Sequence, residues 1–290
     1  MFQRALICTD LTDSIYRLAQ FVPSLAAGGL KSLVFFHSVA VETEREIPRH
    51  DPELLEGPRQ QLQALLRQVP EGVDARVEVQ SGRASDNILR LAKQGQADVI
   101  FLGSATRTML EEKLFGSTTL QLSEKSEVPL VILRPQLLAT YTTAELDLRC
   151  SHLFRYLLLP YDGRQGSKTL VDRIRHQVQS NPDSVLERIR LLWVIDENIR
   201  PELLGDHPLE DAQDALATVQ AELAALGLVV NLTVVTGDPL KQILAAAEAH
   251  DIGAIAIASR GFGGLLKWSA PSLSRELMRH CWHPLLFFPS

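Results

Sequence analysis

Short apolar runs and longer amphipathic segments alternate along the whole chain. The apolar runs show little alternation with polar residues, which is typical of strands buried on both faces of a parallel sheet. In the first half the predicted strands are Arg4–Cys8, Leu33–His37, Ala75–Val79, Asp98–Leu102 and Val128–Leu133. In the second half they are Tyr156–Leu159, Ile189–Val194, Val230–Val235, Ile252–Ile257 and Leu285–Phe288.

The segments between these strands carry apolar residues at helical spacing. The predicted helices are Ile15–Leu25, Pro52–Gln68, Ser85–Gln94, Ser117–Lys125, Ser167–Gln179, Leu209–Ala225, Pro239–His250 and Ser272–His280. Strands that alternate with helices predict an α/β fold with a parallel sheet and right-handed crossovers. Each half is therefore predicted to be a five-stranded parallel sheet with helices on both faces, a Rossmann-like domain.

The two halves repeat one another. Gly82 and Gly237, Ser117 and Ser272, and Pro129 and Pro284 all stand 155 positions apart, whereas Asp10 and Asp162 stand 152 apart. A period of this length indicates a duplicated domain and not a solenoid. We predict a first domain at residues 1–136, a polar linker at 137–152 and a second domain at 153–290.

The composition limits which kinds of partner the protein can bind and in which compartment we expect it. The net charge is −6 and no basic run occurs, which argues against a nucleic-acid partner because such binding depends on neutralising phosphates. The apolar runs are much shorter than the roughly 20 residues of a membrane helix, and the start of the chain lacks the apolar stretch of a signal peptide. Three scattered cysteines suit a reducing compartment. We expect a cytoplasmic protein with no membrane partner.

Candidate binding residues follow the predicted strands. Ligands of parallel sheets bind beyond the carboxyl ends of the strands, where the first half has Asp10, Ser38 and Gly103 and the second has Asp162, Val194 and Ala258. A glycine loop of the form G-x-x-G, nine residues, G-S can be traced in both halves. Its altered copies run from Gly103 to Ser117 and from Ala258 to Ser272.

Five motifs occur in the same order in both halves. They are CTDLT and PYDGR, FFHSV and LLWVID, VQSGRASDNIL and VVTGDPLKQIL, the glycine loop, and a final strand that begins at a proline. With these motifs the chain resembles the universal stress protein family in its tandem form, nearly from end to end. The resemblance implies two adenine-nucleotide α-hydrolase-like domains. It also implies that the final strands, Val128–Leu133 and Leu285–Phe288, pair as an internal pseudo-dimer, and it leaves a further homodimer open.

The resemblance implies ATP binding, with Mg²⁺. In ATP-binding members the strand-end Asp contacts the ribose, the end of the second strand contacts adenine through its backbone, and the glycine loop holds the phosphates. A helix start suits phosphate because of its free N–H groups and its dipole. Carried over to this chain, the candidate residues are Asp10, Thr12, Ser38, Gly103, Thr106, Gly116, Ser117, Thr118, Asp162, Val194, Gly261 and Ser272.

Both copies of the loop depart from the family pattern. In the first, Thr106 replaces the second glycine. In the second, Ala258 replaces the first glycine, and Pro271, which has no N–H to donate, replaces the glycine before Ser272. Arg164 also stands where the family has a serine. The first domain therefore keeps the better site, and we expect at most one good site.

Simpler interpretations remain open for these residues. Asp10 and Asp162 could cap turns, and Gly116-Ser117 could be an ordinary helix start. The sequence has no metal-ligand spacing, no G-x-S-x-G elbow and no Walker motif. We expect a non-catalytic stress-response regulator that binds ATP or another adenine nucleotide. The alternatives are a ligand-independent protein-interaction module and a weak ATP-hydrolysing enzyme.

Overall fold

The computed structural model describes residues 1–40, 52–66, 68–104, 117–198, 207–259 and 273–289. The chain divides into two compact units, which consist mainly of Phe2–Ser151 and His152–Phe288. Thr106, Gly116, Gly261 and Ser272 lie outside the described residues.

The first unit is a parallel α/β sheet. Its elements are β1 (Arg4–Cys8), the 3-10 helix η1 (Ile15–Gln20), α1 (Val22–Ala27), β2 (Ser32–Val39), α2 (Pro52–Leu65), β3 (Asp74–Ser81), α3 (Ala84–Gln94), β4 (Val99–Gly103), α4 (Ser117–Lys125), β5 (Leu130–Leu133), α5 (Pro135–Thr140) and α6 (Thr143–His152). The strand order is β3-β2-β1-β4-β5, and neighbouring strands pair in parallel.

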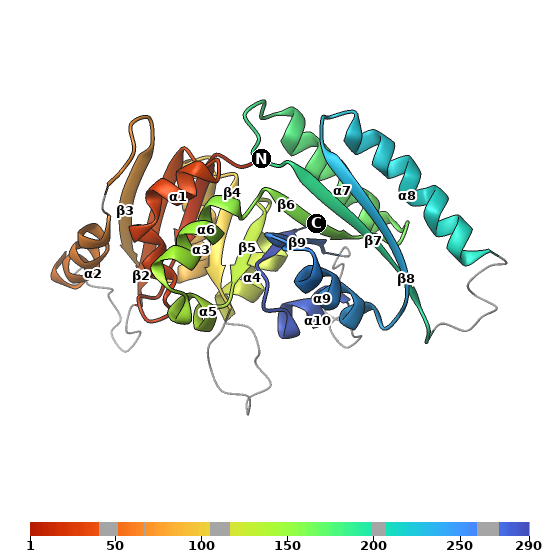
Figure 1. Ribbon diagram of the computed structural model, residues 1–290. Coiled ribbons are helices and arrows are strands. Elements are labelled where there is room, and N and C mark those ends of the chain that lie inside the picture. Colours follow the sequence, from red (N-terminus) through yellow and green to blue (C-terminus); the bar gives the residue numbers. More distant parts are fainter. Residues whose placement is uncertain (41–51, 67, 105–116, 199–206, 260–272, 290) are drawn as a thin grey trace. The chain divides into compact units, whose positions relative to one another are not determined.

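The second unit repeats this arrangement. Its elements are β6 (Tyr156–Pro160), α7 (Gln165–Gln179), β7 (Arg188–Asp196), α8 (Pro208–Ala224), β8 (Val229–Gly237), α9 (Pro239–Ala249), β9 (Ala254–Ala258), α10 (Leu273–His280) and β10 (Leu285–Phe288). The order is β10-β9-β6-β7-β8, also parallel. Helices α7 and α8 run along one face of this sheet, and α9 and α10 lie against the other (Figure 1). Two parallel five-stranded α/β units are thus confirmed.

The strands lack alternation because most of their residues are buried whichever face of the sheet they point to. All residues of β5 and β10 are buried, as are all but one in β1, β4 and β9. The duplication also extends to single hydrogen bonds. Ser104 donates its N–H to the carbonyl of Leu133 at 2.8 Å, and Ser259 does the same to Phe288 at 2.9 Å.

The first predicted helix is broken. The sequence pattern predicts one helix over Ile15–Leu25, whereas the structure has η1 followed by α1 with a junction at Phe21. Pro23 explains the break, because proline has no N–H for the preceding turn and its ring disfavours a continuous helix. It occupies the first turn of α1, where it is well tolerated.

The segment 137–152, predicted to be a linker, is largely helical, and its residues up to Ser151 are counted with the first unit. The guanidinium of Arg17 on η1 donates to the carbonyls of Leu138 and Tyr141, the latter at 3.1 Å. Leu138 and Leu146 are buried. Few residues of this segment are both apolar and buried, and those few, with the Arg17 bonds, hold it against η1 and α1.

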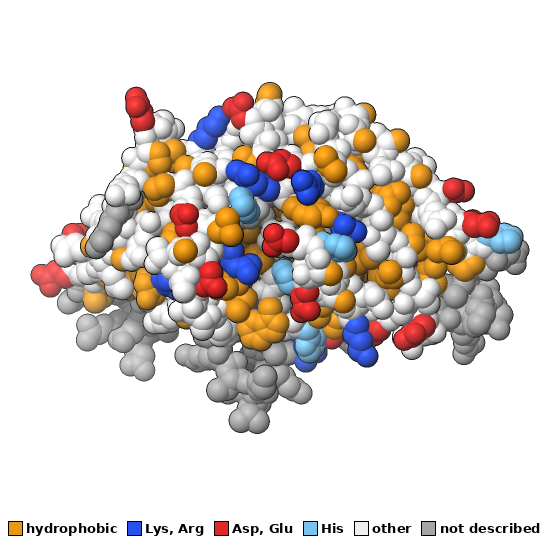
Figure 2. Space-filling model, viewed as in Figure 1, with side chains coloured by type: hydrophobic (Ala, Val, Ile, Leu, Met, Phe, Trp, Pro, Cys, Tyr) orange, Lys and Arg blue, Asp and Glu red, His pale blue; other side chains and the backbone are white. Residues whose placement is uncertain are grey.

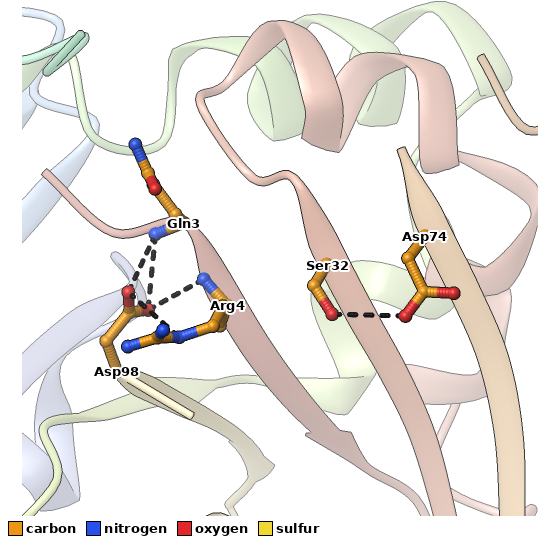
Figure 3. A network of polar contacts seen from close by, with 5 residues as sticks. All are labelled: Gln3, Arg4, Ser32, Asp74 and Asp98. Carbon is orange, nitrogen blue, oxygen red and sulfur yellow. Dashed lines mark hydrogen bonds and ion pairs between the residues drawn. The ribbon is translucent and has the colours of Figure 1, made fainter. Parts of the chain in front are cut away.

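A carboxylate joins the amino ends of β1 and β4 (Figure 3). Asp98 accepts the N–H of Gln3 at 3.1 and 3.2 Å and the N–H of Arg4 at 2.8 Å. The Arg4 side chain lies 4.0 Å from the same carboxylate. In the same view Ser32 donates to Asp74 at 3.4 Å, across β2 and β3. Burial raises the pKa of Asp98, although the bonds from Arg4 and Gln3 oppose this rise.

Asp98→Ala is expected to lower the free energy of unfolding of the first unit by about 1–3 kcal/mol, because the partly buried N–H of Gln3 and the exposed N–H of Arg4 both lose their acceptor. Asp98→Asn should cost less, since its amide oxygen still accepts a hydrogen bond. Urea denaturation of both variants measures the difference. Equal losses for Ala and Asn would contradict this account of the contact.

The surface on the viewed side of the molecule mixes charges. In Figure 2, Lys and Arg side chains of the described residues are interspersed with Asp and Glu and form no broad basic field. Among the described helices, none has both the length and the apolar character needed to cross a bilayer.

Candidate functional site

The carboxyl ends of three strands adjoin in the first unit. β1 lies between β2 and β4, with Cys8 opposite Phe36 and Ile7 opposite Phe101. Asp10 lies just beyond β1, Ser38 is the second-last residue of β2 and Gly103 is the last residue of β4. The parallel pairing therefore brings these predicted site residues to one edge of the sheet.

Asp10 is exposed and only partly engaged. Its Oδ1 accepts the N–H and the hydroxyl of Thr12, both at 2.8 Å. Within the described residues no hydrogen bond engages Oδ2. The turn interpretation and the binding interpretation are thus compatible, because one oxygen closes the turn and the other stays available. Thr12 uses its hydroxyl to orient Asp10.

Ser38 has a structural role for its side chain. Its Oγ donates to the carbonyl of Gly82 at 3.0 Å and accepts from Asn87 Nδ2 at 3.3 Å. These bonds tie the end of β2 to the turn between β3 and α3. A ligand at this strand end would meet the backbone of Ser38, as the family resemblance implies, and not its hydroxyl.

Gly103 is needed for close packing. A Cβ built at this position would lie 3.1 Å from Oδ2 of Asp13, 3.1 Å from Cγ of Pro135 and 3.3 Å from Cγ1 of Ile15. The space beside the strand end is therefore filled in part by the chain's own residues. Asp13, which is not among the predicted site residues, faces the first glycine of the loop.

Asp13 is partly buried, and its carboxylate accepts hydrogen bonds from neighbouring residues. Its Oδ1 accepts the Thr9 hydroxyl at 2.7 Å and the N–H of Ile15 at 3.1 Å. Burial raises the pKa of Asp13; the bond from Thr9 opposes the rise, and the charge of Asp10 adds to it. Within the described residues neither carboxylate forms an ion pair with Lys or Arg. The edge also carries a cation, because Arg134 follows β5 and its guanidinium donates to the Ser104 hydroxyl at 3.4 Å.

Helix α4 begins at the same edge. Ser117 is exposed and Thr118 is half-buried at its start. The next residue, Thr119, donates its hydroxyl to the carbonyl of Gly103 at 3.3 Å. In the second unit Ser274 donates to Ala258 in the same way, at 3.1 Å. This repeated bond fixes the start of the helix against the end of the strand.

In the second unit Asp162 is enclosed by its own turn. Its Oδ1 accepts the Ser167 hydroxyl at 2.8 Å and the Arg164 N–H at 3.1 Å, and its Oδ2 lies 3.8 Å from Arg164 Nε. Ser167, five positions downstream, thus supplies a hydroxyl contact that sequence reasoning did not assign. Here the arginine balances the charge of the strand-end carboxylate.

An aromatic pair lies beside this turn. Gly163 adopts φ +70°, and a Cβ there would meet the Trp193 ring at 3.0 Å. The Tyr161 and Trp193 rings are 5.9 Å apart and tilted by 57°. Burial raises the pKa of Tyr161, with smaller contributions from the charges of nearby carboxylates. Val194, the predicted contact at the end of the second strand, is half-buried, and β7 continues beyond it to Asp196.

The sequence contains a signal for some of the contacts that were not predicted, but not for others. Thr119 and Ser274 stand 155 positions apart, so the repeat alone could have identified them. Asp13, Ser167 and the Gly163–Trp193 contact depend on how loops fold over the strand ends, and the sequence pattern gives no sign of them.

Taken together, the chain is a tandem α/β protein whose units each place an aspartate and a helix start at the carboxyl ends of parallel strands. The model of the universal stress protein family matches residues 1–134 and 154–289. The chain therefore belongs to the universal stress protein family.

Known relatives agree over nearly the whole chain. The universal stress proteins Rv2319c of Mycobacterium tuberculosis and Mb2346c of Mycobacterium bovis are each 26% identical to it, covering 97% of this chain and 90% of theirs. A universal stress protein from Archaeoglobus fulgidus has a similar fold, with a TM-score of 0.68, 18% identity and 98% of each chain covered. The functionally unknown protein PA1789 from Pseudomonas aeruginosa has a TM-score of 0.62 at 13% identity, with 99% of this chain and 92% of that chain covered.

Proposed function

We propose that the protein is a non-catalytic regulator that binds an adenine nucleotide or nucleoside at the strand ends of the first unit. The observation that carries the proposal is the exposed Asp10, whose Oδ2 is not engaged by the described residues. Membership of the family and the lack of hydrolase motifs in the sequence support a binding role. Three buried free thiols suit a cytoplasmic location.

Each described element has a role in this proposal. Asp10 accepts hydrogen bonds from ribose hydroxyls, and the backbone near Ser38 faces the base. The start of α4 donates its backbone N–H groups and the hydroxyls of Ser117 and Thr118 to the phosphates of a nucleotide. The bond from Thr119 to Gly103 holds that helix start in place. For ATP, Mg²⁺ would offset part of the negative charge.

Asp10→Ala is expected to weaken adenosine and ATP binding by about 10- to 100-fold, because hydrogen bonds to a charged group contribute roughly 1.5–3 kcal/mol. Isothermal titration calorimetry with each ligand measures this loss. The control is Asp214→Ala, which removes an exposed carboxylate on α8. Absence of binding to the unaltered protein at millimolar ligand, or unchanged affinity in Asp10→Ala, would overturn the proposal.

For the second unit the geometry favours a structural or partner-binding role. Asp162 already accepts bonds from Ser167 and Arg164 and is paired with the Arg164 side chain. A ribose would have to displace these partners. The same titrations with Asp162→Ala should therefore show the affinity of the unaltered protein.

A further inference from the structure

Asp13 directs one carboxylate oxygen at the place where the glycine loop begins. The bonds from Thr9 and Ile15 both end on Oδ1, whereas Oδ2 lies 3.1 Å from the Cβ position of Gly103, as near as Cγ of Pro135. Capping η1 accounts for Oδ1 alone. The backbone N–H of Asp10 also stabilises this carboxylate, and Oδ2 lies on the side that faces Gly103.

The charge of Asp13 opposes the ligand group that a glycine loop ordinarily holds. The carboxylate lies near Asp10, whose charge adds to the rise in its pKa, and no cation of the described residues pairs with either. Two like charges a few ångströms apart near a protein surface repel strongly enough to change affinity by at least about tenfold. Arg134, which donates to the Ser104 hydroxyl at 3.4 Å, offsets part of this repulsion but, within the described part of the chain, pairs with neither carboxylate. A phosphate near Gly103 would still meet the charge of Asp13, and an uncharged nucleoside would not.

The second unit shows that the repeat does not require this carboxylate. At the offset of 152 that relates Asp10 to Asp162, the counterpart of Asp13 is Gln165. There Arg164 lies 3.8 Å from the strand-end carboxylate. The same turn therefore forms with a neutral side chain at this position and with a cation beside the aspartate.

We propose that Asp13 is a specificity-determining residue that makes the first-unit site prefer an uncharged nucleoside, adenosine, over its phosphorylated forms. This inference rests on the proposed nucleotide or nucleoside binding by that site. Asp10 supplies the attraction for the ribose, and Asp13 excludes negative charge from the strand end at Gly103.

The test compares adenosine, AMP and ATP by calorimetry in EDTA, where no divalent cation offsets the phosphates. The unaltered protein should bind adenosine at least about tenfold more tightly than ATP. Asp13→Asn should reduce this ratio by about tenfold or more, through tighter ATP binding with adenosine affinity nearly unchanged. Asp10→Asn is the matched control, because it removes the ribose acceptor and should weaken adenosine binding, which Asp13→Asn should leave nearly unchanged.

Asp13→Ser guards against loss of the cap, since a serine hydroxyl can still accept the Ile15 N–H without a charge. Circular dichroism confirms that both variants fold. If ATP binds the unaltered protein as tightly as adenosine, or if the ratio survives in both variants, the role of Asp13 is refuted while the binding function stands. If no ligand binds, the proposed function fails and the inference fails with it.

Discussion

Phe101→Ala is expected to lower the free energy of unfolding of the first unit by about 3–5 kcal/mol. The side chain is fully buried, with 0% exposed, on strand β4. It lies opposite Ile7 of β1 and Val131 of β5. Truncation removes the ring from a packed core and leaves a cavity that flanking strands cannot close without losing their pairing. Urea unfolding followed by circular dichroism measures the loss.

The matched control for Phe101 is Leu54→Ala on α2. Leu54 is 60% exposed, so its truncation should change stability by less than about 0.5 kcal/mol. If both variants lost a similar free energy of unfolding, burial would not explain the loss caused by Phe101→Ala.

Gly28→Ala is expected to displace α6 from α1 and to lower stability by about 1–3 kcal/mol, the usual cost of overpacking. Gly28 ends α1 with φ −77°, a backbone conformation that alanine adopts freely. The obstacle is steric, since a Cβ there would lie 2.6 Å from the backbone oxygen of Cys150. Hydrogen exchange should therefore become faster in Thr143–His152, and urea unfolding should occur at lower concentration.

Gly57→Ala provides the opposite control. Gly57 lies within α2, and a Cβ there meets nothing within 4 Å. Alanine should raise stability by roughly 0.5–1 kcal/mol, because glycine is a poor helix former. If Gly28→Ala were also neutral or stabilising, with unchanged exchange in α6, the close contact between α1 and α6 would be disproved.

The fold could be predicted from sequence because two independent signals agree. Apolar runs placed every strand to within a few residues, and the spacing of Gly82 and Gly237 revealed the duplication. The break before α1 was readable from Pro23 but was outweighed by the helical periodicity around it. The sequence analysis missed the helices α5 and α6 because each buries only two residues. The rest of the segment is mostly exposed, so its pattern of apolar and polar residues resembles that of a linker.

The sequence predicted only those site residues whose position follows from the end of a strand. Asp10 and Gly103 follow from the parallel topology, because ligands and polar residues gather at one edge of such sheets. The orientation of Asp13 toward Gly103 and the packing of Trp193 on Gly163 depend on the path of loops. Those paths are set by tertiary contacts, which a single sequence does not encode in a periodic pattern.

The packing of α5 and α6 also determines where the chain can be dissected. A first-half fragment that stopped at β5, as the sequence repeat suggests, would lose the partners of Arg17 and would uncover the α1 surface around Gly28. A fragment that extends through Ser151 keeps both. The sequence repeat and the compact unit thus have different endpoints, and the first compact unit is longer than the segment that is repeated.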